Sequence, residues 1–188
     1  MNTNGGSAVH GSALQTEIER IAAFAQKASF ETTHLTDAQI EEVRQTAPKG
    51  CAIFVAAIPS RPLDEQITTA RGLRNAGFEP IPHLAVRNFA SVDAMEDQLR
   101  KAIDQAGVTR ALVIAGDREK PEGNLLDALA AIKSGVLQRH GLREIGISGY
   151  PDGHPRIDDA KLEQALTDKL KAAADAHIES RIGRSLEL

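Results

Sequence analysis

The chain has 188 residues, of which 26% are charged and 41% apolar, a composition typical of one globular domain with a sizeable core. Its formal net charge of −4 argues against a broad nucleic-acid surface, which needs basic residues to neutralise phosphates. A single cysteine, no apolar stretch near the roughly 20 residues of a membrane span, and no N-terminal signal pattern together predict a cytoplasmic protein that binds neither nucleic acid nor membrane.

The N-terminal part of the sequence predicts a tail and then a helix. Residues 1–11 are mostly small and polar and predict a disordered tail, which leaves residues 12–188 as a single α/β domain. Over residues 12–27, apolar side chains recur at three- and four-residue spacing, with Ile18 and Ile21 at the centre. This spacing predicts an amphipathic helix ahead of the first strand.

Short apolar runs alternate with helical patterns along the rest of the chain. The runs predict buried β-strands over residues 28–31, 52–58, 79–86, 108–115 and 144–149. Apolar periodicity and capping residues predict helices that begin near Asp37, Leu63, Ser91, Asn124 and Leu162. Those from Leu63 and Ser91 are expected to end at Gly77 and Gly107, and the helix over residues 124–139 is expected to face Leu126 inward. Such alternation predicts parallel strands joined by right-handed crossovers, and it leaves open whether the sheet is doubly wound or forms a barrel. The two common nucleotide fingerprints of open sheets are absent from the sequence.

Polar side chains follow the predicted strands at their C-terminal ends. The run over residues 111–117 ends in Gly-Asp, and the other predicted strands end near further acids, histidines and a tyrosine: Glu31, His83, Asp117, Tyr150 and His154. Taken singly, each has an ordinary structural explanation, but the ends of parallel strands converge on one rim and could line a single pocket there. The sequence has no paired-histidine spacing and no cysteine cluster, so we expect no metal site.

These motifs resemble those of the methylenetetrahydrofolate reductases in order and spacing. The resemblance runs from about residue 28 to residue 176 and rests on Ser-Phe-Glu at 29–31, Pro-His-Leu at 82–84, Gly-Asp at 116–117 and Gly-Tyr-Pro-Asp-Gly-His-Pro at 149–155. It implies a (β/α)8 TIM-barrel flavoprotein of one-carbon metabolism and methionine biosynthesis. Such an oxidoreductase uses FAD to pass hydride from NADH or NADPH to the folate, reducing 5,10-methylenetetrahydrofolate to 5-methyltetrahydrofolate.

The resemblance also implies roles for individual residues. Glu31 matches the general acid that helps to open the five-membered folate ring, and Phe30 and the strand rim are candidates for the apolar setting that such an acid needs. Asp117 matches an aspartate near the flavin and the pterin, where it would influence the flavin's electronics, and it completes the catalytic pair that the resemblance implies. The cofactor-binding set implied by the resemblance is His83, Gly116, Asp117, Tyr150, His154 and Lys169, the last of them beside the cofactor's phosphates.

The sequence also departs from the family pattern. Ala115 stands where the family has arginine, and the second strand ends in Ile-Pro-Ser at 58–60 instead of Thr-Tyr-Gly. Ile-Glu-Ser-Arg at 178–181 stands where the family has a sixth strand that ends in Thr-Gln. A full barrel takes about 250 residues, so we expect an incomplete barrel of about five to six β/α units with an extra N-terminal helix. The alternative to a reductase is a non-catalytic folate- or flavin-binding protein or subunit. Exposed edge strands would favour a homo-oligomer or a partner subunit that completes the barrel.

Overall fold

The computed structural model describes residues 7–184, and within them six parallel strands form one sheet. The strands are β1 (Phe30–Thr32), β2 (Ala52–Val55), β3 (Glu79–Ala85), β4 (Arg110–Ile114), β5 (Glu144–Gly149) and β6 (Glu179–Arg184). Their order in the sheet is their order in the chain. Each right-handed crossover therefore moves one strand in the same direction, which places all the helices on one face. This topology belongs to a barrel and not to a doubly wound sheet.

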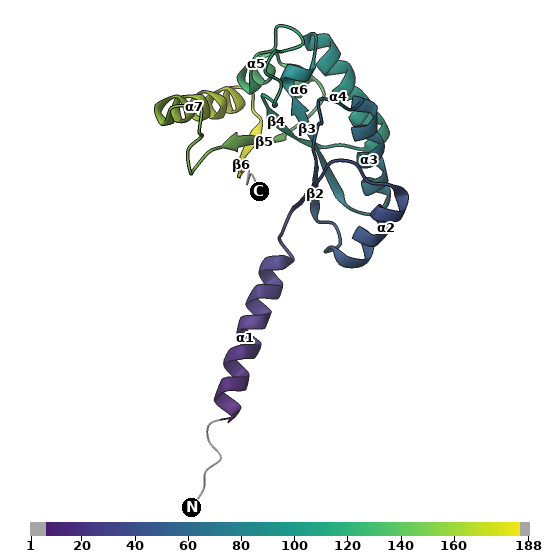
Figure 1. Ribbon diagram of the computed structural model, residues 1–188, viewed down its shortest axis with the longest axis vertical. Helices are drawn as coiled ribbons and strands as arrows, with labels where there is room; N and C mark the ends of the chain where they lie inside the picture. The colour runs from purple at the N-terminus through teal and green to yellow at the C-terminus, as the bar shows by residue number, and fades with distance from the viewer. Residues whose placement is uncertain (1–6, 185–188) are drawn as a thin grey trace, which may run out of the picture.

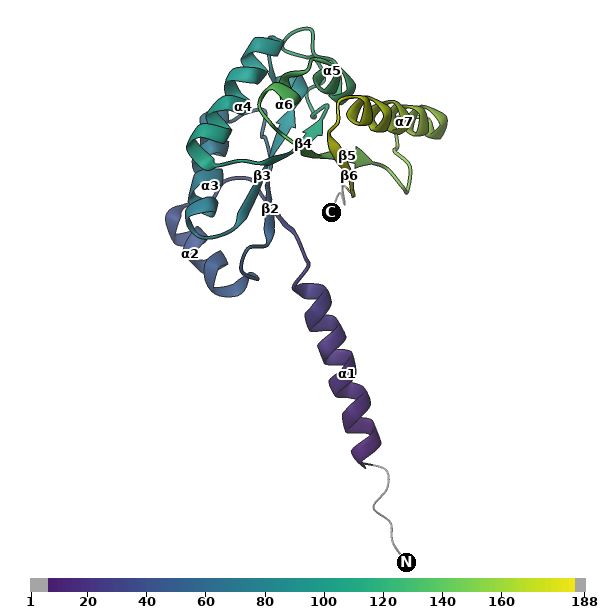
Figure 2. The ribbon, with the colours of Figure 1, turned by 180° about the vertical axis from the view of Figure 1, so that it is seen from behind.

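The helices cover the convex face of the curved sheet, as Figures 1 and 2 show from opposite sides. They are α2 (Asp37–Thr46), α3 (Leu63–Asn75), α4 (Val92–Ala106), α5 (Ala128–Lys133), α6 (Val136–Arg139) and α7 (Asp159–Asp175), with a short 3-10 helix, η1 (Val86–Asn88), after β3. Helix α1 (Ser7–Ala25) extends away from this body. Within the described residues the sheet does not close, and β1 and β6 are its two edges.

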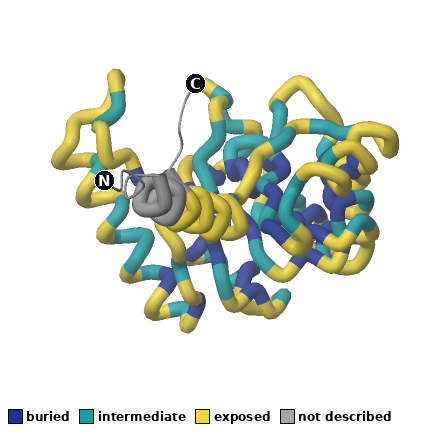
Figure 3. Tube along the Cα trace, turned by 90° about the horizontal axis from the view of Figure 1, so that it is seen from below, coloured by how far each residue is buried: buried dark blue, intermediate teal, exposed yellow. Residues whose placement is uncertain are grey.

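The core lies between the sheet and the helices. Alternate residues of β2 and β4, such as Val55 and Val113, are fully buried against the helices, whereas Phe54 and Leu112 on the opposite face are half-buried. In Figure 3 the buried positions follow the strands and the inward sides of the helices, and the described part of α1 is exposed. The concave face of the sheet is therefore the more open of the two faces.

Several helix ends fall where the sequence predicts them. The Ser91 hydroxyl accepts a hydrogen bond from the Ala94 backbone N–H at 3.1 Å and so caps α4, and Gly107, with φ of 58°, ends that helix in the left-handed conformation. Gly77, with φ of 90°, follows the end of α3 in the same way. Strand β5 has the predicted bounds, and the other predicted strands lie within a few residues of the observed ones.

Two predicted helical segments differ from the structure. The helix predicted over residues 124–139 is two helices, α5 and α6, because Gly135 has φ of 76° and breaks the helical path. Asp127 caps α5, so residues 124–127 form a loop in which Leu125 is buried and Leu126 is 58% exposed, the reverse of the predicted inward face. Helix α1 begins at Ser7 and so includes part of the predicted tail, whose residues 1–6 lie outside the described chain.

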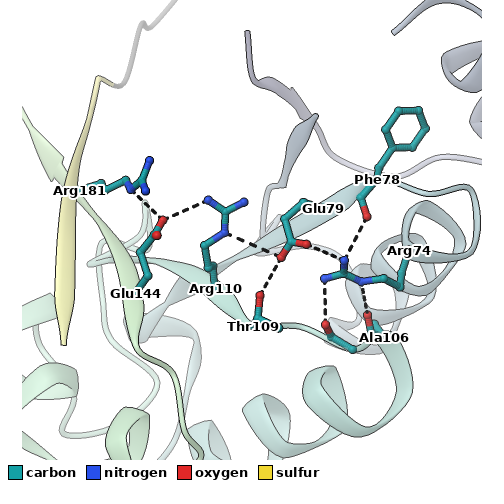
Figure 4. Close-up of polar contacts among 9 residues, drawn as sticks. Arg74, Phe78, Glu79, Ala106, Thr109, Arg110, Glu144 and Arg181 are labelled. Atoms are coloured by element: carbon teal, nitrogen blue, oxygen red, sulfur yellow. Dashed lines mark hydrogen bonds and ion pairs between the residues drawn. The ribbon is translucent and has the colours of Figure 1, made fainter. Parts of the chain in front are cut away.

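An ion-pair network crosses the N-terminal ends of four neighbouring strands (Figure 4). Glu79 on β3, Arg110 on β4, Glu144 on β5 and Arg181 on β6 alternate in charge. Arg110 Nη1 lies 3.1 Å from Glu144 Oε1, Arg181 Nε lies 3.0 Å from the same oxygen, and Arg110 Nε lies 3.8 Å from Glu79 Oε1. This end of a barrel normally contributes to stability and not to catalysis.

Glu79 has the most partners in this network. Its carboxylate accepts hydrogen bonds from Arg74 Nη1 at 2.6 Å and from the Thr109 hydroxyl at 2.8 Å. Burial raises the pKa of the Glu79 carboxyl, but these hydrogen bonds and the charges of Arg74 and Arg110 outweigh burial, so its pKa is lowered overall. The network therefore holds Glu79 ionised and joins α3 to the edges of β3 and β4.

Candidate functional site

Three of the predicted site residues meet at the C-terminal rim of the sheet. His83 Nε2, from β3, lies 3.8 Å from Glu31 Oε2, from β1, and the charge of Asp117, which follows β4, acts on the same imidazole. Phe54 of β2, the strand between β1 and β3, contacts His83 edge-on, with ring centroids 6.1 Å apart. Residues far apart in sequence are thus adjacent because their strands are neighbours and parallel.

His83 is the buried member of this group. It is only 8% exposed, and burial lowers the pKa of its imidazole to about 4, although the Asp117 carboxylate partly opposes the change. The ring is therefore neutral at pH 7. Its Nε2 is buried and has no hydrogen-bond partner among the described residues. Buried polar atoms in native proteins usually have a partner, so this nitrogen is available to a ligand.

Glu31 is the solvent-exposed member of the group. Its side chain is 61% exposed, so water and a ligand can both reach the carboxyl group. Phe30, its neighbour in β1, is 44% exposed and points to the opposite face of the sheet, because side chains alternate along a strand. Phe30 therefore does not provide the apolar setting that the sequence suggested for Glu31.

The loop that carries Asp117 turns sharply after β4. Gly116 has φ of 87°, and a Cβ there would lie 2.9 Å from the Ala85 Cβ, so this position needs glycine both for its backbone conformation and for its closeness to β3. The Arg87 backbone N–H donates to the Ala115 carbonyl at 3.0 Å. The tip of β3 thus fixes where the loop leaves β4.

Arg87, in η1, is a residue of this rim that sequence analysis missed. Its guanidinium donates from Nε to the Leu126 carbonyl at 2.8 Å and from Nη1 to the Arg118 carbonyl at 3.3 Å. Its own carbonyl accepts from the Glu122 N–H at 2.9 Å. Arg87 therefore holds both ends of the loop that follows Asp117. Nothing in the sequence linked this arginine to a loop some 30 residues away, since the contact arises only when β3 and β4 pair.

Tyr150 and His154 form a second group after β5. Their rings pack edge to face with centroids 5.2 Å apart, and Tyr150 is 38% exposed. His154 Nδ1 accepts a hydrogen bond from the Arg156 backbone N–H at 3.2 Å, which holds the ring against the loop. Tyr150 and His154 contact each other and their own loop. Within residues 7–184, no hydrogen bond, ion pair or ring contact joins them to Glu31, His83 or Asp117, although all five residues follow strands of the same sheet.

Lys169 reaches the end of β5 from α7. Its Nζ donates a hydrogen bond to the Ser148 carbonyl at 2.8 Å. Burial lowers the pKa of its ammonium group, and the Asp127 carboxylate partly opposes this effect. The lysine is thus placed near the rim, with one of its three N–H donors already used by the strand.

Residues 7–184, which the structure describes, hold neither a metal cluster nor a membrane-spanning helix. Within them, no group of three or more His, Cys, Asp or Glu side chains is arranged to hold a metal ion. In the same part of the chain, no helix has the length and apolar character needed to cross a membrane.

Comparisons with known proteins give a partial sequence match and a fold match. No protein-family model matches the chain. The 5,10-methylenetetrahydrofolate reductase of Pectobacterium carotovorum subsp. carotovorum is 32% identical over 103 residues, which is 53% of this chain and 32% of that protein. The match thus spans about a third of the relative's length. Part of the chain is therefore similar to a methylenetetrahydrofolate reductase.

The structural comparison concerns the fold alone. A Burkholderia cenocepacia J2315 protein, provisionally named a phosphonomutase, superposes with a TM-score of 0.59 over 84% of this chain and 69% of its own, at 13% sequence identity. That similarity and the sequential order of the six parallel strands confirm the predicted TIM-barrel type of α/β fold.

Proposed function

We propose that this chain is a methylenetetrahydrofolate-reductase-like flavoprotein whose rim binds FAD and a reduced folate. The observation that carries the proposal is the meeting of Glu31, His83 and Asp117 at the C-terminal ends of β1, β3 and β4. The partial sequence similarity to a 5,10-methylenetetrahydrofolate reductase supports it independently. Cytoplasmic location and the use of NADH or NADPH are parts of the same proposal.

The residues at the rim fit a flavin. The buried, unpartnered Nε2 of His83 needs a hydrogen-bonding partner, and a polar ring system such as isoalloxazine offers one. Asp117 can accept hydrogen bonds from ring N–H groups, and Gly116 lets the backbone come close to a flat ligand. The remaining residues that would hold the cofactor are Tyr150, His154 and Lys169. When bound, FAD supplies the hydride chemistry that no amino-acid side chain provides.

The protein's own side chains would carry out the proton transfer to the folate. The Glu31 carboxyl, open to solvent, can donate a proton from Oε2 to a folate nitrogen and regain it from water. Because burial lowers the pKa of the His83 imidazole to about 4, this ring, with Nε2 3.8 Å from Glu31 Oε2, does not take up the proton at pH 7. The Asp117 carboxylate favours a proton on the His83 imidazole, although burial of the ring outweighs this effect.

A non-catalytic folate- or flavin-binding role is the second candidate. Two observations favour it. Ala115 stands where the resembled family has an arginine, which removes a cation from the rim. The Lys169 ammonium already donates to the Ser148 carbonyl, so less of its hydrogen-bonding capacity is left for a phosphate.

Glu31→Gln separates the two roles. In a reductase, the variant keeps FAD and keeps NAD(P)H oxidation with menadione as acceptor, but it loses methylenetetrahydrofolate reduction by about 100-fold or more, because the general acid is gone. Glu42→Gln, on the exposed surface of α2, is the matched control and leaves both activities unchanged. A Glu31→Gln variant that binds folate normally, when the wild type shows no turnover, supports the binding role.

A further inference from the structure

The side-chain amide of Gln66, on α3, is buried against the sheet. Helix α3 packs on β2 and β3, and Gln66 is only 6% exposed, although glutamine is usually a surface residue. Its Nε2 donates one hydrogen bond to the Val55 carbonyl of β2 at 2.8 Å and another to the His83 carbonyl of β3 at 3.1 Å. Both N–H groups of the amide are thus used, and they join two neighbouring strands at their C-terminal ends.

Strand β2 ends before its backbone can bond the His83 carbonyl. In the ladder between β2 and β3, the Glu79 N–H donates to the Cys51 carbonyl at 3.0 Å, and this parallel pattern repeats at every second residue. The His83 carbonyl therefore faces β2, and the Ala57 N–H is the next donor in the pattern. Ala57 lies beyond the end of β2, and among the described residues no hydrogen bond joins it to that carbonyl. The Gln66 amide supplies the donor in its place.

The same helix holds the chain where it leaves β1. Thr69 is fully buried one turn further along α3. Its Oγ1 lies 3.3 Å from His34 Nδ1 and accepts a hydrogen bond from the Leu35 N–H at 3.5 Å. Helix α3 therefore contacts the chain after β1 as well as the ends of β2 and β3. Because β1 carries Glu31 and β3 carries His83, the separation of these two side chains depends on the packing of one helix.

We infer that Gln66 is a positioning residue of the rim, whose amide holds the backbone of His83 so that the imidazole Nε2 lies 3.8 Å from Glu31 Oε2. A buried carbonyl without a donor is costly, so loss of the amide would let the end of β3 move away from α3 and admit water beside the ring. The inference rests on the proposed function for its effect on FAD, whereas the setting of His83 can be measured without a cofactor.

An NMR titration of His83 in the cofactor-free chain tests this role. Gln66→Met removes both donors and keeps a side chain of similar length. We expect the pKa of the imidazole to rise in this variant from about 4 toward 6.5, because water beside the ring reduces the effect of burial. An unchanged His83 pKa in Gln66→Met overturns the inference.

Gln98→Met is the matched control for this titration. Gln98 is also 6% exposed, and its Nε2 donates to the Leu63 carbonyl at 3.0 Å, at the start of α3 and not in a strand. This variant should lose stability as Gln66→Met does, but its His83 pKa should stay at about 4. An equal rise of the His83 pKa in both variants overturns the inference, since it reduces Gln66 to one buried hydrogen-bonding residue among others.

FAD affinity gives a second readout. Gln66→Met should bind FAD about tenfold more weakly than the wild type, and the same change in the His83→Gln background should have no further effect, because Gln66 acts through His83. A further tenfold loss in that background overturns the inference. A wild type that binds no FAD contradicts the proposed function, and the titration of His83 then decides the role of Gln66 by itself.

A measurement on the wild type decides the matter if Gln66→Met does not fold. Both protons of the Gln66 side-chain amide should exchange with solvent at least tenfold more slowly than those of Gln105, an exposed glutamine of α4, because both are bonded to strand carbonyls. Fast exchange of the two protons, followed by NMR, overturns the inference.

Discussion

Acid should destabilise this protein through His83. Burial holds the pKa of the folded imidazole at about 4, against 6.5 in an unfolded chain. Between these values the unfolded state binds a proton that the folded state does not, so stability falls as the pH falls through 6.5 and the loss levels off near 4. The whole difference is worth about 3 kcal/mol, and about 2 kcal/mol of it is lost between about pH 7.5 and pH 5.

Urea unfolding of wild type and His83→Gln at the two pH values isolates this contribution. The variant has no imidazole at that position, so its free energy of unfolding should fall by about 2 kcal/mol less than that of the wild type on acidification. His154→Gln, in the loop after β5, is the matched control and should behave as the wild type. Equal pH dependence in wild type and His83→Gln, or an NMR titration of His83 centred near 6.5, would refute the reasoning.

Three further changes test the fold. Glu79→Gln should lower the free energy of unfolding, measured in urea, by about 2 kcal/mol, because it removes the negative charge that accepts hydrogen bonds from Arg74 and Thr109. Glu41→Gln, in an exposed ion pair with Arg44, is the control and should leave the midpoint of urea unfolding unchanged. Gly116→Ala should cost about 1–2 kcal/mol and weaken ligand binding at Asp117; an unchanged midpoint would contradict the required left-handed conformation. His177→Gly, at a residue with φ of 53°, should raise the melting temperature through a gain of about 0.5 kcal/mol, and a lower melting temperature would contradict it.

The sequence predicted the elements well because each signal is local. Buried parallel strands appear as apolar runs in the sequence. Ser91 and Gly107 mark the ends of α4, because a serine hydroxyl can cap a helix and a glycine can adopt the left-handed conformation. The break at Gly135 escaped prediction because apolar spacing continues through it. The burial of Leu125 in place of Leu126 has a similar origin, since the loop before α5 shifts the apolar pattern by one residue.

The site was predictable only where topology alone brings residues together. Glu31, His83 and Asp117 each lie within a few residues of the C-terminal end of a strand, so parallel neighbouring strands place them on one rim. The contacts of Arg87 with a distant loop depend on side-chain reach, which leaves no trace in the sequence. The hydrogen bond from Lys169 to the Ser148 carbonyl likewise depends on side-chain reach and could not be predicted from the sequence.

Titration of the purified chain with FAD is the most direct test of the proposed function. We expect saturable binding of one FAD per chain, a yellow protein after removal of free cofactor, and affinity at least tenfold weaker in His83→Gln, because Nε2 is the buried group that awaits a partner. Glu42→Gln, on the exposed surface of α2, should bind FAD as the wild type does. A chain that remains colourless, with no change in flavin absorbance or fluorescence at any FAD concentration, would contradict the proposal that this rim is a flavin site.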